Sequence, residues 1–573
     1  MSKNKEPKTY GEALFEAKRG FLIIGFTGYT GSGCSTAATA LVGNTKLPFP
    51  TTKPDNKISV GNYSTRRFEK LKAIWGGMDW EPFTSIEVGV VIFAILAKQA
   101  IKEPAPNGIL AEIKSLCETH LENLTEGLSV LEIETDNKRR LEEGEAELLV
   151  KAYEQCVELH KEYKEGKRTT SHLGTFIKDF QTAGDKIRMY GKYVSGQPEP
   201  KNMFVMPDAI RKIISAYRRS RNKNRFVIDA FRNPFEVEYF RRRYEEFYLV
   251  GIFRNGLQRT ATLEKHLNNE DIDHLNKKED GKHPTDGESE ESKPKEDQKN
   301  IGWWVTGQNI PECSQKADVF INNKSDKSWI FFSLIKTLAL INKPGCLTPS
   351  NDEHNMQIAS TARLMSGCLS RQVGASLVGE KGYVLGIGWN DPPQGQVPCA
   401  LRSCGELFGQ NALAQNDDCI KDKAFSEFEQ SNDMKEFIKK RKDSDVPFCF
   451  RTEYSELRSK EEKQKVKLVE YTRALHAEEN AILQTAKIGG TSLRGATLYT
   501  TSSTCTLCAK KAYQLGVKRI VFIERYPDKA YDQTILTGTH KMDFDQFEGI
   551  TGSAYYKLYV ALMPEKDLID YYS

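Results

Sequence analysis

Three potential metal ligands between residues 475 and 508 restrict the fold of this chain more than any other feature of its sequence. His476 supplies an imidazole, and Cys505 and Cys508 supply two thiolates in a CxxC spacing. Such a set occupies three corners of a tetrahedral zinc site and leaves the fourth position open. Glu478 is not needed as a ligand, so its carboxylate can take a proton from water and return it to a leaving group. We therefore expect one catalytic Zn2+ ion.

The local pattern predicts a helix, a strand, a turn and a second helix across this stretch. Residues Glu478–Thr485 have helical apolar spacing, and Leu498–Thr500 are typical of a strand. A turn that carries Cys505 then leads into a helix near Ala509–Leu515. This order brings the histidine and the two cysteines together. The alternatives are a packed histidine and a cysteine pair with a redox role.

The order His476, Glu478, Cys505, Cys508 resembles the HxE…CxxC signature of the zinc-dependent nucleobase deaminases. In those enzymes an activated water attacks C4 of cytosine or C6 of adenine. The resemblance implies that Glu478 is the catalytic acid and base. One difference is Thr504, which stands where the signature has proline, and it removes no ligand.

Composition limits the domain count, the partners and the compartment. A length of 573 residues is too great for one hydrophobic core, so we expect two or more domains. The net charge is only +4 although 28% of the residues are charged, which argues against stable binding to nucleic acid. The N-terminus has no apolar signal segment, and no apolar run is long enough to span a membrane. We therefore expect a cytoplasmic protein whose twelve cysteines are scattered and reduced.

A glycine-rich turn follows an N-terminal tail, residues 1–20. Phe21–Phe26 reads as a buried parallel strand, and Ala37–Leu41 reads as a helix. Between them, backbone N–H groups and a helix N-terminus can hold phosphates as in a P-loop. The loop residues assigned to nucleotide binding are Gly28, Gly31, Gly33, Cys34, Ser35 and Thr36. Because Cys34 occupies the position of the usual lysine, we expect a regulatory nucleotide without phosphoryl transfer. The alternative is a glycine-rich turn that binds nothing.

The following segments resemble the P-loop nucleoside-monophosphate kinases over residues 21–342. Residues 98–131 and 138–164 have helical periodicity, and 225–230 and 247–253 read as buried strands. The resemblance implies a parallel sheet with helices. It also implies that arginines lie over the phosphates, and the matching residues are Arg232, Arg254 and Arg259. The most polar segment, 265–300, is expected to be a mobile or disordered insertion.

A second domain, 346–573, is expected after Lys343–Gly345, where proline and glycine end a helix. It begins with a predicted helix, Met356–Leu364, followed by a hairpin of Arg371–Val378 and Tyr383–Gly388. An insertion at 395–470 contains four cysteines and no histidine. These are Cys399, Cys404, Cys419 and Cys449. They could form a second, structural zinc site, but their irregular spacing favours free thiols.

The segments RQVGASLV, GIGWNDPPQG, HAEENAI and CTLC resemble the deoxycytidylate deaminase family in order. This resemblance implies a three-layer α/β/α domain with a mixed five-stranded sheet, and a homo-oligomer such as a dimer or hexamer. It also implies that Asn390 contacts the sugar of the substrate and that Arg371 contacts a phosphate. A turn asparagine and a surface arginine are the alternatives.

The two predicted domains together resemble the bacterial anti-phage dCTP deaminases. That resemblance implies a hydrolase that converts dCTP to dUTP and depletes a precursor needed by a phage. The residues alone indicate only hydrolytic deamination of a cytosine nucleotide. Two alternatives stay open: a dCMP deaminase of nucleotide metabolism, and a polynucleotide deaminase, which would need a basic groove and stacking aromatic residues.

Overall fold

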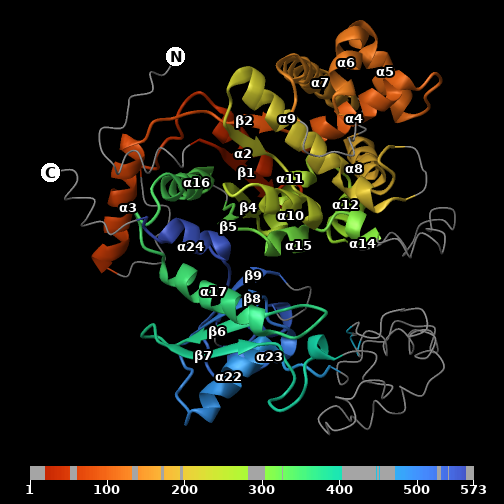
Figure 1. The fold of residues 1–573 in the computed structure, drawn as a ribbon. Coiled ribbons are helices and arrows are strands. Elements are labelled where there is room, and N and C mark those ends of the chain that lie inside the picture. Colours follow the sequence, from red (N-terminus) through yellow and green to blue (C-terminus); the bar gives the residue numbers. More distant parts are fainter. Residues whose placement is uncertain are drawn as a thin grey trace, which may run out of the picture. The chain divides into compact units, whose positions relative to one another are not determined.

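The computed structural model describes residues 20–51, 61–131, 140–169, 173–193, 198–281, 303–324, 327–402, 447, 449, 451, 472–525, 531–539 and 541–562. The chain forms two compact units (Figure 1). The first unit is Met1–Thr348 together with Ser553–Ser573, and the second unit is Pro349–Gly552. Among the residues described, no helix is both long enough and apolar enough to cross a membrane.

The first unit is built on a parallel sheet with β1 at its centre. Its strands are β1 (Leu22–Thr27), β2 (Thr84–Ile86), β3 (Arg225–Ile228), β4 (Phe247–Phe253) and β5 (Val319–Asn322). They lie in the order β5-β4-β1-β3-β2, and every neighbouring pair is parallel. Both β1 and β4 are buried along their whole length, as expected for strands covered on two faces. The predicted parallel sheet is therefore present.

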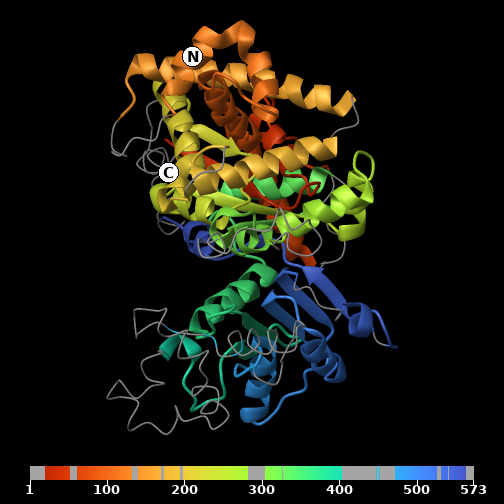
Figure 2. The same ribbon diagram turned by 90° about the vertical axis from the view of Figure 1, so that its right-hand side faces the viewer.

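Helices connect and cover these strands, and those between β2 and β3 gather on one side of the unit (orange to yellow in Figures 1 and 2). The helices are α2 (Cys34–Val42), α3 (Gly61–Gly77), α4 (Val88–Lys102), α5 (Ile109–Cys117), α6 (Leu121–Ser129), α7 (Glu143–Thr169), α8 (Leu173–Tyr190), α9 (Val205–Arg221), α10 (Pro234–Arg243), α11 (Gly256–Leu263), α12 (Asn269–Glu279), α14 (Trp303–Thr306), α15 (Ile310–Gln315), α16 (Lys327–Asn342) and α24 (Ser553–Tyr559). The helical stretch predicted at 98–131 is divided among α4, α5 and α6.

The order of the strands creates a switch point beside β1. From β1 the chain supplies β2 and β3 on one side and β4 and β5 on the other. In open parallel sheets, ligands bind at the carboxyl ends of the strands where the order reverses in this way. The glycine-rich loop follows β1 directly and so lies at this edge.

The prediction that 265–300 is a mobile or disordered insertion is wrong for part of its length. Residues Asn269–Glu279 form α12, with Asn268 accepting a hydrogen bond as its N-cap. Ile272 and Leu275 are buried against Leu263 and Leu267. Two apolar residues spaced three apart are enough to fix one face of a short helix, although the segment as a whole is polar. Residues 282–300 lie outside the described part of the chain.

The second unit contains a mixed sheet of five strands, as predicted. The strands are β6 (Gly374–Val378), β7 (Val384–Trp389), β8 (Thr497–Ser502), β9 (Arg519–Glu524) and β10 (Asp543–Gln546), and a short β11 spans Gly549–Ile550. Their order is β10-β9-β8-β6-β7. β6 pairs with β7 and β8 in antiparallel fashion, and β8-β9 and β9-β10 are parallel. The predicted hairpin is the β6-β7 pair.

Glycines let helices approach both faces of this sheet closely. The helices are α17 (Asn351–Ala362), α22 (Ala477–Lys487) and α23 (Thr506–Gln514), and Tyr531–Ile535 form a short π-helix. A Cβ atom at Gly374 would lie 2.0 Å from the carbonyl oxygen of Ala359 in α17, and one at Gly388 would lie 2.0 Å from that of Ala477 in α22. Gly374 is paired with Trp389, and directly paired residues point to the same face of a sheet. Successive residues along a strand point to opposite faces, so Gly388 faces the side opposite to Gly374. α17 therefore covers one face and α22 the other (Figure 1).

The expected boundary of the second domain, 346–573, differs from the observed division. The second unit begins at Pro349 and ends at Gly552, and α24 belongs to the first unit. There Gly345 donates its backbone N–H to the carbonyl oxygen of Leu558 at 2.9 Å, and the Leu558 side chain is fully buried. The sequence of this short helix does not specify the core on which it packs.

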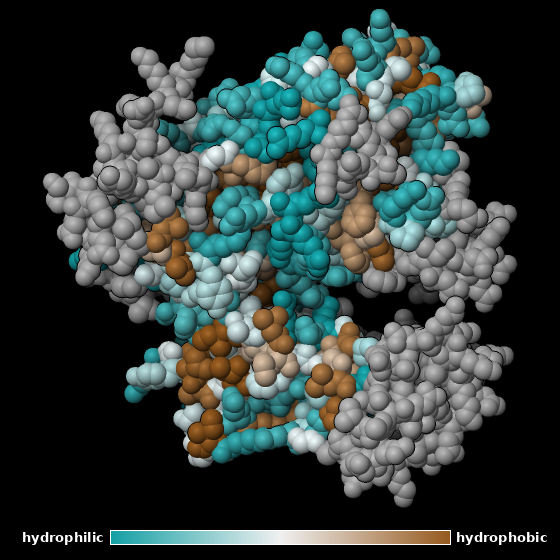
Figure 3. Space-filling model, viewed as in Figure 1, coloured by the Kyte–Doolittle hydropathy of each residue, from teal (hydrophilic) through white to brown (hydrophobic). Residues whose placement is uncertain are grey.

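Hydrophobic side chains are exposed on the second unit, where Figure 3 shows brown patches. Those of large size are Leu364, Met365, Leu369, Tyr383, Val384, Leu401, Leu483, Ile488, Leu507, Leu515 and Leu536. Exposed apolar groups of this kind often mark sites of association.

Candidate active site

Two helix N-termini hold the predicted metal ligands. His476 is the N-cap residue of α22, and Cys505 is the N-cap residue of α23. Cys508 lies in the first turn of α23 and is almost fully buried. Helix N-termini carry partial positive charge, which favours thiolates in this position. The local structure predicted for this stretch, with helix, strand, turn and helix, is the one observed.

The three ligand atoms have the separations that a tetrahedral zinc ion requires. His476 Nδ1 lies 3.3 Å from Cys505 Sγ and 3.5 Å from Cys508 Sγ. Zinc–nitrogen and zinc–sulfur bonds of about 2.0 and 2.3 Å at a tetrahedral angle give a nitrogen–sulfur distance of about 3.6 Å. Within the described part of the chain, this is the only group of three His, Cys, Asp or Glu side chains close enough to hold a metal ion. The residues therefore fit zinc.

Contacts with Cys508 and His476 lower the pKa of the Cys505 thiol below its usual value. The thiolate is the form that binds metal, so this sulfur is ready to act as a ligand at neutral pH.

Glu478 lies beside the ligands and away from water. Its side chain is 4% exposed, and burial raises its pKa to about 7. A carboxyl group with a pKa near neutral pH can both accept and return a proton during a reaction. The chain thus places a proton carrier two residues from His476.

Asn390 lies directly after β7 and links two segments of backbone. Its Oδ1 accepts from the N–H of Val373 at 2.6 Å, and its Nδ2 donates to the carbonyl oxygen of Arg371 at 2.7 Å. The side chain is 9% exposed. One N–H and one lone pair of the amide are not used in these two bonds. Contact with a sugar stays a prediction.

Arg371 is paired within the unit. It donates from Nη2 to Glu524 Oε1 at 2.8 Å and from Nη1 to Ser502 Oγ at 3.2 Å. Neither partner was predicted from the sequence, although Glu524 ends the apolar strand RIVFIE and an acidic residue there is a usable signal. A phosphate contact by Arg371, which stays a prediction, would have to share the guanidinium with Glu524.

The cysteines of the predicted insertion are described only in part. Cys404 and Cys419 lie outside the described residues, as does most of 395–470. Cys399 and Cys449 are half-buried. Burial raises the pKa of Cys399, and the nearby Cys449 and Cys368 raise it further. The second zinc site stays a prediction.

The glycine-rich loop of the first unit has the backbone form of an anion-binding turn. Gly31 and Gly33 have φ angles of +86° and +113°, which side chains rarely allow. α2 begins at Cys34, and burial raises the pKa of its thiol to about 12, so this position carries no charge at neutral pH. Three arginines donate hydrogen bonds to the loop. Arg232 donates to Thr30 Oγ1 at 2.9 Å, Arg254 to the carbonyl oxygen of Gly31 at 3.4 Å, and Arg259 to the carbonyl oxygen of Thr30 at 2.7 Å.

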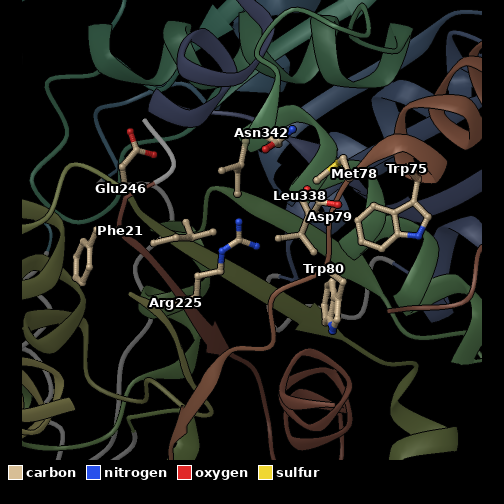
Figure 4. Close-up of a pocket in the computed structure, with 11 residues that line it drawn as sticks. Phe21, Trp75, Met78, Asp79, Trp80, Arg225, Glu246, Leu338 and Asn342 are labelled. Atoms are coloured by element: carbon tan, nitrogen blue, oxygen red, sulfur yellow. The ribbon is translucent and has the colours of Figure 1, made fainter. Parts of the chain in front are cut away.

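A separate pocket of the first unit lies between its first strand and α16 (Figure 4). It is lined by Phe21, Leu22, Trp75, Met78, Asp79, Trp80, Arg225, Glu246, Leu338, Ile341 and Asn342. Its cavity volume is about 30 Å³. This space suits a water molecule, whereas ligand pockets measure about 300–1,000 Å³.

Comparison with known proteins places the similarity in the second unit. Residues 349–524 match the family model described as the cytidine and deoxycytidylate deaminase zinc-binding region. The chain is 32% identical to the deoxycytidylate deaminase of Enterobacteria phage T4 over 177 residues, which is 30% of this chain and 76% of that protein. It is 24% identical to the deoxycytidylate deaminase of Schizosaccharomyces pombe over 222 residues, 38% of this chain and 51% of that protein. The crystal structure of dCMP deaminase from the cyanophage S-TIM5 in apo form is 19% identical and covers 35% of this chain and 100% of its own, with a TM-score of 0.20, too low to support an argument.

Proposed function

The chain belongs to the cytidine and deoxycytidylate deaminase family, and from this premise we propose that its second unit deaminates a free deoxycytidine nucleotide. The observation that carries the proposal is the position of Glu478, buried beside His476, Cys505 and Cys508. This arrangement combines a three-ligand metal site with a proton carrier. It suits the hydrolytic replacement of an amino group by oxygen.

His476, Cys505 and Cys508 would hold the zinc ion, which when bound lowers the pKa of a water molecule toward about 7. Glu478 takes one proton from the attacking water and delivers it to N3 of the ring. It then takes the second proton from the hydroxyl group that has added to C4 and delivers it to the departing ammonia, so the carboxyl group ends in its starting state. Burial of Glu478 excludes bulk water from these transfers.

The finer proposal is that dCTP is the preferred substrate and that its conversion to dUTP starves an infecting phage of a precursor. This proposal is supported by the combination of a deaminase unit with a unit that carries a glycine-rich loop. Asn390 would contact the sugar and Arg371 a phosphate. The second candidate is dCMP, which the two related enzymes act on by name.

Oligomer formation and regulation complete the proposal. The exposed apolar side chains of the second unit favour a homo-oligomer, either a dimer or a hexamer. The glycine-rich loop would bind a regulatory nucleotide that shifts the deaminase between less active and more active states, provided that it binds them with different affinity.

Incubation of the purified protein with dCTP, dCMP, dCDP and single-stranded DNA, followed by chromatography, tests the proposal. Uracil nucleotide should appear from dCTP fastest. The Glu478→Gln variant is the control, because it should keep its zinc and form no product. Product from dCMP alone would indicate a dCMP deaminase of nucleotide metabolism. Uracil in DNA would indicate a polynucleotide deaminase. Absence of product from every substrate would contradict the proposal.

A further inference from the structure

The end of helix α12 fills the mouth of the glycine-rich loop with a carboxylate. Glu279 Oε1 accepts from the Thr30 N–H at 3.0 Å and from Thr30 Oγ1 at 2.6 Å. Arg232 donates to the same oxygen, and Arg259 Nη2 lies 3.2 Å from Oε2. The Glu279 side chain has no exposed surface. A residue far along the chain thus supplies an anion to the loop.

The neighbours of Glu279 fix the same helix end. Lys278 Nζ lies 3.0 Å from Asp185 Oδ2 in α8. Asp280 Oδ1 accepts a hydrogen bond from the Tyr29 hydroxyl at 2.7 Å, and Tyr29 belongs to the loop itself. Three consecutive residues therefore dock the end of α12 by polar contacts. Ile272 and Leu275, seven and four residues before Glu279 and so on the same face of the helix, hold it in a small apolar cluster.

The partners of Glu279 are also the partners that a phosphate needs. A backbone N–H, a hydroxyl and two guanidinium groups bind phosphate oxygens as readily as they bind a carboxylate. Cys34 leaves the loop without its usual ammonium, so Arg232 and Arg259 supply the positive charge. Both arginines follow strands that end at the same edge of the sheet, next to β1.

We propose that Thr30, Arg232 and Arg259 form a phosphoryl-binding site whose present occupant is the Glu279 carboxylate. A ligand phosphate takes the place of this carboxylate, because it needs the same Thr30 and arginine donors that Glu279 occupies. Binding therefore withdraws Glu279 and loosens the end of α12. Only molecules in which Glu279 has left the arginines can bind the ligand, so the apparent affinity is the intrinsic affinity multiplied by the fraction of such molecules.

Titration calorimetry on the full-length protein tests this site with two probes, inorganic phosphate and ATP. This inference rests on the regulatory nucleotide proposed above for the glycine-rich loop. ATP carries no cytosine, so its binding is separable from deamination, and failure here leaves the deamination proposed for the second unit untouched. The Glu279→Gln variant should bind at least one probe about tenfold more tightly than the wild type, or better. The matched control is Glu270→Gln, an exposed glutamate of the same helix, which should bind as the wild type does. Adding Arg259→Gln to Glu279→Gln should remove the gain.

The two probes identify the source of the phosphoryl group. Tighter binding of both indicates a site for phosphate itself, and tighter binding of ATP alone indicates a nucleotide site. Unchanged affinity for both probes in a folded Glu279→Gln protein, or an equal gain in Glu270→Gln, overturns the proposal.

Hydrogen exchange of the wild type gives a second measurement that does not depend on the folding of any variant. Saturation with the probe that binds should speed amide exchange at the end of α12, near Asn276–Glu279. Unchanged or slower exchange in that segment, or no binding of either probe, contradicts the displacement of Glu279.

Discussion

Replacing Gly388 with alanine should impair deamination while leaving every metal ligand in the chain. Gly388 lies in β7 under α22, and an added Cβ atom would lie 2.0 Å from the Ala477 carbonyl oxygen and 2.4 Å from the Ala481 nitrogen. Ala477 stands between His476 and Glu478. The new methyl group would therefore press on the turn that carries a metal ligand and the proton carrier.

The size of the effect follows from the distance that has to be recovered. Ordinary contact begins at 3.4 Å, so α22 or β7 must move by about 1.4 Å. A misplacement of about 1 Å costs on the order of 100-fold in rate, and overpacking costs about 1–3 kcal/mol of stability. We expect kcat/KM to fall by on the order of 100-fold, with a decrease in the free energy of unfolding within that range.

Steady-state deamination of dCTP and dCMP, zinc analysis and urea unfolding measure these effects. The control is Gly379→Ala in the same unit, because its Cβ atom would meet only the Leu385 side chain, at 3.3 Å, which can move. It should retain nearly full activity. Wild-type kcat/KM in Gly388→Ala would refute the view that close packing of α22 on β7 positions Glu478.

Three further predictions concern the metal, the pH and a helix cap. Removal of zinc with a chelator should abolish deamination and lower the melting temperature, as should Cys508→Ala, and readdition of zinc should restore only the wild type. Burial lowers the pKa of His160 to about 4, so between pH 6.5 and 4 the unfolded chain binds more protons than the folded chain. The free energy of unfolding should therefore fall by up to about 3 kcal/mol as the pH falls through this range. Urea unfolding of His160→Leu should show a weaker fall, whereas His266→Gln, a change at an exposed site, should match the wild type. Asn233→Ala removes an N-cap that accepts from two backbone N–H groups of α10 and a side chain that donates to the carbonyl oxygens of Val305 and Gly307. Thermal unfolding should therefore show a loss of at least about 1–2 kcal/mol, and no loss would indicate that water replaces these hydrogen bonds.

The clustering of the three proposed zinc ligands could be predicted because their chemistry leaves few alternatives. A histidine, a glutamate and a CxxC pair each have narrow requirements, and the helix-strand-turn-helix pattern around them is local. The β6-β7 hairpin was also predictable, since a tight turn joins two apolar runs, whereas the mixed five-stranded sheet was expected from the resemblance to a known family. In this part of the second unit, the local pattern of the sequence and the chemistry of the ligands predict the same arrangement.

The burial and ion pairing of Glu279 could not be predicted from the sequence. A glutamate in a polar run looks solvated, and its burial depends on arginines that lie 20 and 47 residues away in the chain. The same reason explains the partner of Arg371, which is 153 residues distant. Long-range charge pairing has no periodicity, so the pattern of the sequence cannot reveal it. The place of α24 in the first unit is likewise a property of the assembled core.

The return of the chain to the first unit at Ser553 has a consequence for its biosynthesis. A ribosome completes the whole second unit before it makes α24, whose Leu558 is buried in the first unit. The catalytic unit can therefore mature while the first unit still lacks a piece of its core. Cleavage before residue 553 would leave an intact zinc site on a first unit that has lost this helix. Any experiment that divides the protein should excise residues 349–552 from the middle of the chain, because a single cut after residue 348 separates α24 from the rest of the first unit.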